Sequence, residues 1–250
     1  PETPSDVDFI YDDEDYYLNI SWDYVPDVDF SYLQVSEIWG SPIYTIENLA
    51  SLSIADDPHP YNEFFVNSVD IHDNLSENSE YISVHSLKAG YNLVSFSMLP
   101  EDQSLDLVIP GTGSESPILG IMGEGVAASY IYTDSFGNNF YGWFGSLIYL
   151  SPNSGYWVQC TQDNILIMQG NKNTDSNFEL HIGSNLISYK CFMTGAIDEL
   201  IQNENNCIEG ILGQGVAALS AYSGWVGSLT ELLPGSGYWF KVDNDNVCGN

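Results

Sequence analysis

The sequence predicts an all-β protein, and two observations lead to this fold class. First, the N-terminal part of the chain contains short segments in which apolar and polar residues alternate, separated by turn-forming residues. Second, the rest of the chain contains a set of sequence blocks that occurs twice in the same order. Such ordered repetition indicates an internal duplication of a unit of about 75–80 residues, which is the size of a small domain.

The N-terminal region consists of strand-like segments between turns. In YLNISW and again in FSYLQV, apolar and polar residues alternate as in a strand with one buried face. About seven short strands joined by turns are typical of a β-sandwich. The expected strands lie at 17–22, 30–35, 43–44, 52–54, 62–69 and 81–84.

These segments carry a family resemblance. LNISWD at 18–23 and FSYLQV at 30–35 resemble strands B and C of a fibronectin type III domain. FFVNSVDIHDNLSENS at 64–79 resembles strand F of that family and its turn into strand G, although Asp73-Asn74 stands where Gly-Asn is common. The resemblance implies a β-sandwich with Trp22 in its core, and an adhesive or spacer role without catalytic residues.

The duplicated region begins at residue 90, and its second copy begins at residue 183. The first copy reads GYNLVSF, GEGVAAS, GWFGSL and LSPNSGYWV, and the second reads GSNLISY, GQGVAAL, GWVGSL and LLPGSGYWF. Each copy is expected to be mostly β with one short helix, at 104–109 with Ser104 as its cap and at 196–201. The blocks resemble repeats of secreted bacterial surface proteins, which implies an extracellular location and a structural or adhesive role.

The sequence thus predicts three domains. A fibronectin type III-like β-sandwich is expected at 1–87, followed by a first β-rich repeat domain at 88–170. A polar linker leads to the second repeat domain at 178–250.

The charge of the chain is strongly negative. The 250 residues include 35 Asp and Glu but four Lys and no Arg, which gives a formal net charge of −31. Such a chain repels phosphate backbones and anionic lipid headgroups, so we expect neither nucleic-acid binding nor membrane-surface binding. No segment reaches the roughly 20 apolar residues of a membrane helix, so membrane insertion is not expected. The acidic residues are interpreted as a solvated surface in preference to cation sites.

Cysteine spacing argues against zinc. Cys160, Cys191, Cys207 and Cys248 form no CxxC pair. Their even number suits an oxidising compartment with up to two disulfides, and buried reduced thiols are an equal alternative. Where disulfides form, we expect Cys191 to pair with Cys207, with Cys160 and Cys248 paired or free.

The aromatic residues of the repeats have two interpretations. Trp143, Trp157, Trp225 and Trp239 could stack on a sugar, but such residues more often fill a small β core. In SGYWV and SGYWF, strand alternation sends Tyr to one face and Trp to the other. We therefore expect one member of each pair to be a core residue.

Calcium is the cofactor that the acidic loops could bind, and no other cofactor is expected. Two of three acidic clusters supply the candidate ligands, and the third lies at 243–246. None has the twelve-residue pattern of an EF-hand, and loop acids without an ion are the favoured interpretation. The candidates are Asp12, Asp13 and Asp15 in one cluster and Asp27 and Asp29 in the other.

No catalytic motif is present. The histidines stand outside recognised motifs, and the glycine-rich blocks lack the lysine of a phosphate-binding loop. Glu124 of the first copy is replaced by Gln214 in the second, which argues against a shared catalytic carboxylate. We therefore expect that the protein is not an enzyme.

The functional expectation is an extracellular or cell-surface structural or adhesive protein, acting as a surface or filament subunit. Its partners would be further copies of itself or other surface proteins, and the alternative is a carbohydrate-binding module that contacts polysaccharide. The apolar segment 164–168 closes the first copy, whereas 246–250 is a weak counterpart. A missing strand would leave an acceptor groove for strand addition, with 7–10 as the donor.

Overall fold

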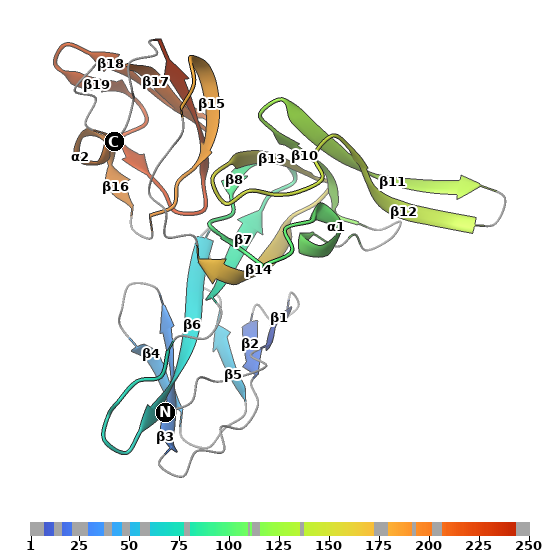
Figure 1. Ribbon diagram of the computed structural model, residues 1–250, viewed down its shortest axis with the longest axis vertical. Helices are drawn as coiled ribbons and strands as arrows, with labels where there is room; N and C mark the ends of the chain where they lie inside the picture. Colours follow the sequence, from blue (N-terminus) through green and yellow to red (C-terminus); the bar gives the residue numbers. More distant parts are fainter. Residues whose placement is uncertain are drawn as a thin grey trace. The chain divides into compact units, whose positions relative to one another are not determined.

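The computed structural model divides the chain into two compact units, Pro1–Ser86 with Ile165–Asn171, and Leu87–Asn164 with Lys172–Asn250 (Figure 1). All structural statements concern the described residues, which are 8–12, 17–21, 30–37, 42–46, 51–55, 61–77, 81–109, 111, 116–135, 138–172, 180–191, 194–201 and 207–243. Strands dominate both units, and the two described helices have four residues each. The predicted all-β class is confirmed.

The first unit contains two sheets. One has the strand order β1-β2-β5, and the other includes the order β4-β3-β6-β7-β14. The strands are β1 (Asp8–Asp12), β2 (Tyr17–Ser21), β3 (Phe30–Glu37), β4 (Pro42–Ile46), β5 (Ser51–Ala55), β6 (Tyr61–Asp70), β7 (Tyr81–Leu87) and β14 (Asn164–Lys172). All the predicted strands of this region are present, and β1 precedes them.

This arrangement is fibronectin type III-like, as the resemblance implied. The strand expected to be B is β2, which pairs with β1 and β5 in one sheet, and the strands expected to be C, F and G are β3, β6 and β7, which are neighbours in the other. Trp22 lies outside the described residues. The buried side chains of this sheet include Leu33, Val35, Phe64, Val66, Ile82 and Val84.

The turn after β6 explains one departure from the family pattern. Asp73 has φ 62°, a left-handed conformation that favours glycine, and Asp is among the residues that tolerate it. Asp70 holds the turn, because its Oδ1 accepts hydrogen bonds from the backbone N–H groups of His72 and Asn74. Hydrogen bonds from Asn74 lower the pKa of the Asp70 carboxyl.

The second unit contains two five-stranded antiparallel sheets with equivalent strand orders, β12-β11-β10-β13-β8 and β19-β18-β17-β21-β15. The first repeat has β8 (Gly90–Ser95), β10 (Ile118–Gly123), β11 (Val126–Ser135), β12 (Asn138–Gly145) and β13 (Gly155–Cys160), with β9 at Met98–Leu99. The second has β15 (Gly183–Ser188), β17 (Ile208–Gly213), β18 (Val216–Ala221), β19 (Gly224–Gly227) and β21 (Gly237–Val242), with a β16–β20 pair at Gly195–Ala196 and Glu231–Leu232.

The two repeats agree in detail. Gly90 and Gly183, at equivalent positions, both have φ 103°. Each repeat has a register shift at the same point, between Ile118 and Gly120 in the first and at the corresponding residues of β17 in the second. The helices α1 (Leu105–Val108) and α2 (Ile197–Leu200) also occupy equivalent places. The prediction that both copies share one fold is confirmed.

Ser104 occupies the N-cap position of α1 but makes no side-chain capping hydrogen bond, so that part of the helix prediction is wrong. The backbone N–H of Leu105 instead donates to the carbonyl of Ile148 at 2.8 Å. The equivalent bond in the second repeat joins Ile197 to Thr230 at 3.0 Å. Each short helix is thus held by the strand region next to it and does not need a side-chain cap.

The predicted closing strand of the first repeat belongs elsewhere. Residues 165–171 of β14 lie in the first unit, where β14 is the neighbour of β7. Both repeats have five-stranded sheets without this segment, and the predicted acceptor groove of the second repeat stays a prediction because the counterpart segment lies outside the described residues. The predicted donor is in use, because Asp8 to Ile10 of β1 pair with β2. Residues 7 and 246–250 lie outside the described residues.

Candidate functional site

Two of the four candidate tryptophans are packed within their repeats. Trp143 of β12 donates its Nε1–H to the carbonyl of Ile109 at 2.8 Å. Its ring meets Tyr130 edge-on, with the ring centroids 5.4 Å apart. Trp225 of β19 packs against the hydrophobic core of the second repeat. Neither ring is therefore a flat platform open to a sugar.

The other two tryptophans lie on the opposite face of each sheet from the core. Tyr156 and Tyr238 are buried, whereas Trp157 and Trp239 are half-buried. The prediction that one member of each Tyr-Trp pair is a core residue is confirmed. We call the face that carries Trp157 or Trp239 the outer face of its repeat.

Each outer face exposes a group of apolar side chains. In the second repeat, Leu212 pairs with Trp239 across the strands, and Leu219 pairs with Val226. Directly opposed residues project from the same side of a sheet, so these side chains are neighbours. From Gly210 onward, the outward positions of β17, β18 and β19 are all Gly, Ala, Val or Leu. None of these strand positions carries a charge, and the charged residues that border them are Lys241, opposite Gly210, and Asp198, next to Gly224.

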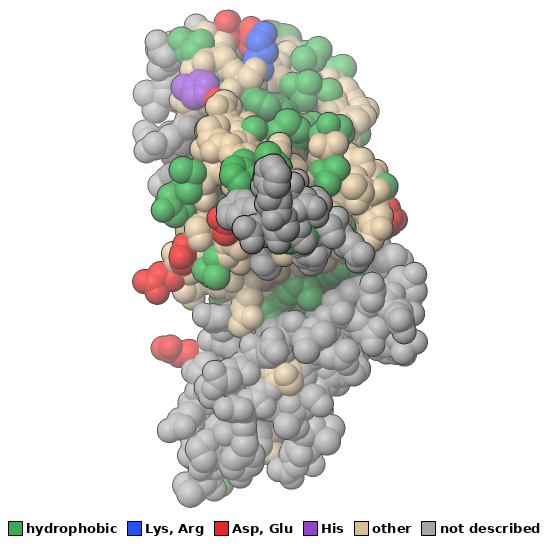
Figure 2. Space-filling view, turned by 90° about the vertical axis from the view of Figure 1, so that its right-hand side faces the viewer, with side chains coloured by type: hydrophobic (Ala, Val, Ile, Leu, Met, Phe, Trp, Pro, Cys, Tyr) green, Lys and Arg blue, Asp and Glu red, His purple; other side chains and the backbone are tan. Residues whose placement is uncertain are grey.

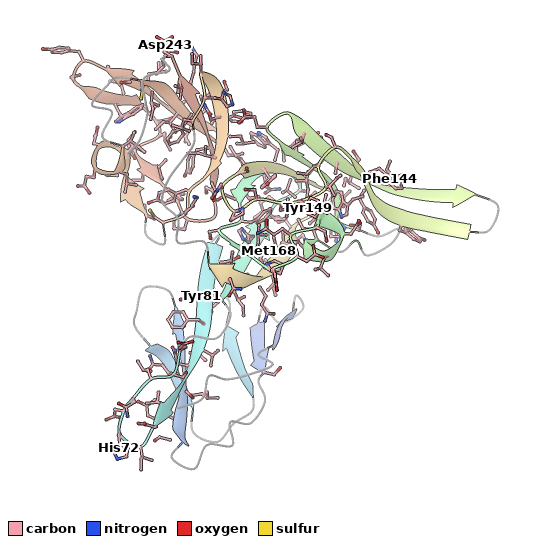
Figure 3. All side chains as sticks on the ribbon, viewed as in Figure 1. His72, Tyr81, Phe144, Tyr149, Met168 and Asp243 are labelled. Atoms are coloured by element: carbon pink, nitrogen blue, oxygen red, sulfur yellow. The ribbon has the colours of Figure 1, made fainter. Side chains whose placement is uncertain are left out.

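The first repeat has the equivalent surface. Met122 corresponds to Leu212 and Phe144 to Val226, and Phe144 projects from β12 as labelled in Figure 3. Figure 2 shows hydrophobic side chains at the surface of this unit. In the first repeat, the exposed fractions are 37% for Met122, 38% for Ile131 and 43% for Phe144. In the second repeat, they are 46% for Leu212, 63% for Leu219 and 58% for Val226.

The two repeats contact each other through equivalent residues. A Cβ atom on Gly155 would lie 2.8 Å from the carbonyl oxygen of Ile187, and one on Gly237 would lie 2.7 Å from that of Val94. Val94 and Ile187 occupy equivalent positions in their repeats. Backbone pairing is also reciprocal, since the N–H of Ser95 donates to the second repeat at 2.8 Å and that of Ser188 to the first at 3.0 Å. The contact thus has the form of an isologous dimer within one chain.

The tip of one hairpin from each repeat caps the edge strand of the other. Gln214, between β17 and β18, accepts a hydrogen bond from the N–H of Leu93 at 2.8 Å and donates one to the carbonyl of Tyr91 at 3.0 Å. Glu124, between β10 and β11, accepts one from the N–H of Leu186 at 2.8 Å. Sequence reasoning missed this role, although both side chains share a carbonyl-type oxygen at the same turn position.

His181 completes the contact of Glu124. Its Nε2 lies 2.5 Å from Oε1 of Glu124, and its Nδ1 lies 2.7 Å from the carbonyl of Ile182. The hydrogen bond with Ile182 and the one with Glu124 raise the pKa of the imidazole. The first repeat has Lys88 at the equivalent position, where it pairs with Asp163.

The cysteines differ from the predicted pairing. Cys207 is disulfide-bonded, whereas Cys160 and Cys191 are free thiols, so the predicted Cys191–Cys207 bond is wrong. Cys207 lies in the core of the second repeat and Cys191 is exposed, which separates their side chains. Burial raises the pKa of Cys160 to about 11. Cys248 lies outside the described residues.

The calcium candidates remain predictions. Asp13, Asp15, Asp27 and Asp29 lie outside the described residues, and Asp12 is described as part of β1 without its side chain. Elsewhere in the described ranges, no three His, Cys, Asp or Glu side chains cluster in a way that could hold a metal ion.

His85 of the first unit is a buried histidine that contacts a neighbouring serine. His85 of β7 lies 3.1 Å from Oγ of Ser83 through its Nε2, and both residues are buried. Desolvation lowers the pKa of His85 to about 3, so the imidazole is neutral at physiological pH. A neutral, enclosed imidazole of this kind is out of reach of a substrate.

Comparisons with known proteins give likenesses to solved structures alone. No family model matches the chain, and no curated protein matches it. It is similar to a chain in the crystal structure of chicken CNTN1 FN1-FN3 domains, with 12% sequence identity and a TM-score of 0.24, over 98% of this chain and 95% of that one. At this TM-score we infer nothing about function from the likeness. Neither described helix is long and apolar enough to cross a membrane.

Proposed function

We propose that this chain is an extracellular structural or adhesive protein, and not an enzyme, that binds further copies of itself through the outer faces of its two repeats. The observation that supports this proposal is the exposed apolar group on each outer face. Leu219 and Val226 are both more than half exposed and directly opposed across β18 and β19. Contiguous apolar surface of this kind is typical of protein interaction sites.

The charge of the chain favours a second copy as the partner. With a net charge of −31, two copies repel each other over most of their surfaces. A basic partner would instead be drawn to the acidic surface. An uncharged apolar face is where another acidic chain can approach at the lowest electrostatic cost. The two repeats within the chain already associate in this isologous manner, through Gly155 and Gly237 on the same faces.

The test is the molar mass in solution as a function of salt. We expect the parent to be mainly monomeric at low ionic strength and to associate as salt rises toward about 1 M, where the Debye length falls to about 3 Å. The variant Leu219→Ser with Val226→Ser should stay monomeric over the whole range, because it removes the apolar contact. Sedimentation velocity gives the masses.

The matched control is Leu107→Ser, which removes an equally exposed leucine from α1, away from the outer face. This variant should associate like the parent. A parent that stays monomeric at every salt concentration would refute the proposal, as would equal association of all three proteins.

The second candidate is a carbohydrate-binding module, which the half-buried Trp157 and Trp239 on the outer faces favour. Binding of a neutral polysaccharide would quench the fluorescence of these two tryptophans. Quenching that is reduced in Trp239→Ala and lost in Trp157→Ala with Trp239→Ala would support this candidate, provided that the parent does not self-associate.

A further inference from the structure

The hydrogen bonds of His181 require two protons on its ring. Nδ1 faces the carbonyl oxygen of Ile182, and Nε2 faces a carboxylate oxygen of Glu124. Both partners are acceptors, so each ring nitrogen must donate. A neutral imidazole carries one N–H and can make only one of these bonds. The geometry therefore fits the charged imidazolium, whose raised pKa has the same origin.

Glu124 links this titrating group to the contact between the repeats. Its Oε1 meets His181, and its Oε2 accepts the hydrogen bond from the N–H of Leu186 on the edge strand β15. The protonated ring of His181 neutralises the Glu124 carboxylate and orients it toward the N–H of Leu186 on β15. When His181 loses its proton, the ion pair is lost and one of the two ring hydrogen bonds must break.

On the opposite side of the contact, the residue equivalent to Glu124 does not titrate. Gln214 occupies the position equivalent to Glu124, and its amide both accepts from Leu93 and donates to Tyr91 without any change of charge. The two edge contacts, which lie at equivalent places in the repeats, therefore differ in their dependence on pH.

We infer that Glu124 and His181 form a pH-sensitive latch that holds the hairpin tip of the first repeat against the edge of the second, while Gln214 holds the other edge at all pH values. The sign follows from the protonation. A histidine whose pKa is raised on folding stabilises the folded state below its unfolded pKa near 6.5, and this contribution is lost as pH rises through the folded pKa. The latch is thus closed in mildly acidic solution and weakens above pH 6.5. This inference does not depend on the proposed self-association.

The charged groups near His181 leave Glu124 as its partner. On the adjacent strand β21, Lys241 is paired with Glu209, and Asp243 follows the strand. The raised pKa of His181 comes from its hydrogen bonds with the Ile182 carbonyl and with Glu124, and from the charge of Glu124. On the side of the first repeat, the hairpin tip between β10 and β11 carries one charged side chain, that of Glu124.

The experiment compares the parent chain of 250 residues with Glu124→Gln by NMR between pH 5.5 and 8.5. The first readout is the pKa of His181 from its ring resonances, which should lie above 6.5 in the parent and fall in Glu124→Gln. The second is amide hydrogen exchange, expressed as the protection of Leu186 relative to Leu93. In the parent this ratio should fall about two- to fivefold with rising pH, the range for an exposed ion pair, and in Glu124→Gln it should stay constant.

The chain supplies a matched control. Gln214→Glu places a carboxylate at the other edge, where it can no longer donate to Tyr91. It should reduce the protection of Leu93 at every pH and leave the pKa of His181 unchanged. Glu124→Gln copies a residue that the second repeat already uses, and the dispersion of its amide spectrum checks its fold. The same pKa of His181 in parent and Glu124→Gln would overturn the latch, and so would a parent Leu186 to Leu93 ratio that does not change with pH.

Discussion

At the scale of single residues, Gly155 and Gly237 decide how closely the two repeats approach. Both lie where a side chain would meet the backbone of the other repeat, at 2.8 Å and 2.7 Å from carbonyl oxygens. Approaches below 3.0 Å to backbone atoms cannot be relieved by a side-chain rotation, so a strand must move. Glycine is therefore required at both positions because the two repeats approach closely there, and not because a turn needs its backbone freedom.

Gly155→Ala and Gly237→Ala should each destabilise the protein, by about 1–3 kcal/mol, the usual cost of overpacking. Gly120→Ala is the control, because its Cβ would meet its nearest neighbours at 3.5 and 3.6 Å, an ordinary contact distance. Urea denaturation followed by tryptophan fluorescence gives the free energies of unfolding. Equal midpoints for the interface variants and the control would show that the repeats do not approach as described.

At the scale of elements, the sequence predicted where the strands lie but not which strands are neighbours in a sheet. Alternation and turn residues located β2, β3 and β6, and the repeated blocks showed that the two repeat sheets have the same order. Residues 164–168 were also predicted to be a strand, but an apolar strand pattern does not say which sheet it joins. The structure places it as β14 beside β7.

The candidate site was predicted in part for a related reason. Alternation placed Tyr156 and Trp157 on opposite faces of the strand, and the structure shows that Tyr156 is the core residue. It could not show that Glu124 reaches an edge strand 62 residues away in the chain, because that contact depends on how the repeats pack. A difference between the repeats, Glu124 against Gln214, was visible in the sequence and was read only as evidence against catalysis.

The buried tyrosines attach β13 and β21 to the turns that precede these strands. Tyr156 accepts a hydrogen bond from the N–H of Ser151 at 2.7 Å, and Tyr238 accepts one from Leu233 at 2.8 Å. Burial raises the pKa of both phenols, so each hydroxyl stays protonated at physiological pH. The same bond in both repeats indicates that it fixes the entry into β13 and β21.

Tyr156→Phe and Tyr238→Phe should each cost about 0.5–1.5 kcal/mol, the net value of one hydrogen bond. The aromatic rings stay in the core, so the loss reports the hydroxyl alone. Tyr149→Phe is the matched control, because Tyr149 is 65% exposed. Thermal unfolding at neutral pH measures the differences. Variants as stable as the control would mean that the bond contributes nothing.

At the scale of the whole molecule, the dominant property is the excess of negative charge. The chain has 35 acidic residues and four lysines, so most carboxylates have no basic partner. The ion pairs that the structure describes are solvent-exposed, such as Lys88 with Asp163, and pairs of this kind contribute little to stability. Self-repulsion of the compact state should therefore outweigh the attraction within pairs.

Added salt should accordingly raise the melting temperature at neutral pH. Screening weakens the repulsion among carboxylates more than it weakens the few exposed pairs, and each kcal/mol gained raises the melting temperature by about 2–4 °C in a protein of this size. Calorimetry at about 0.02 M and 0.5 M sodium chloride measures the shift. The control is the same pair of salt concentrations near the sequence pI of 4.1, where the net charge and therefore the screening gain are small. A melting temperature that falls with salt at neutral pH would show that attractive pairs, and not self-repulsion, govern the stability of this chain.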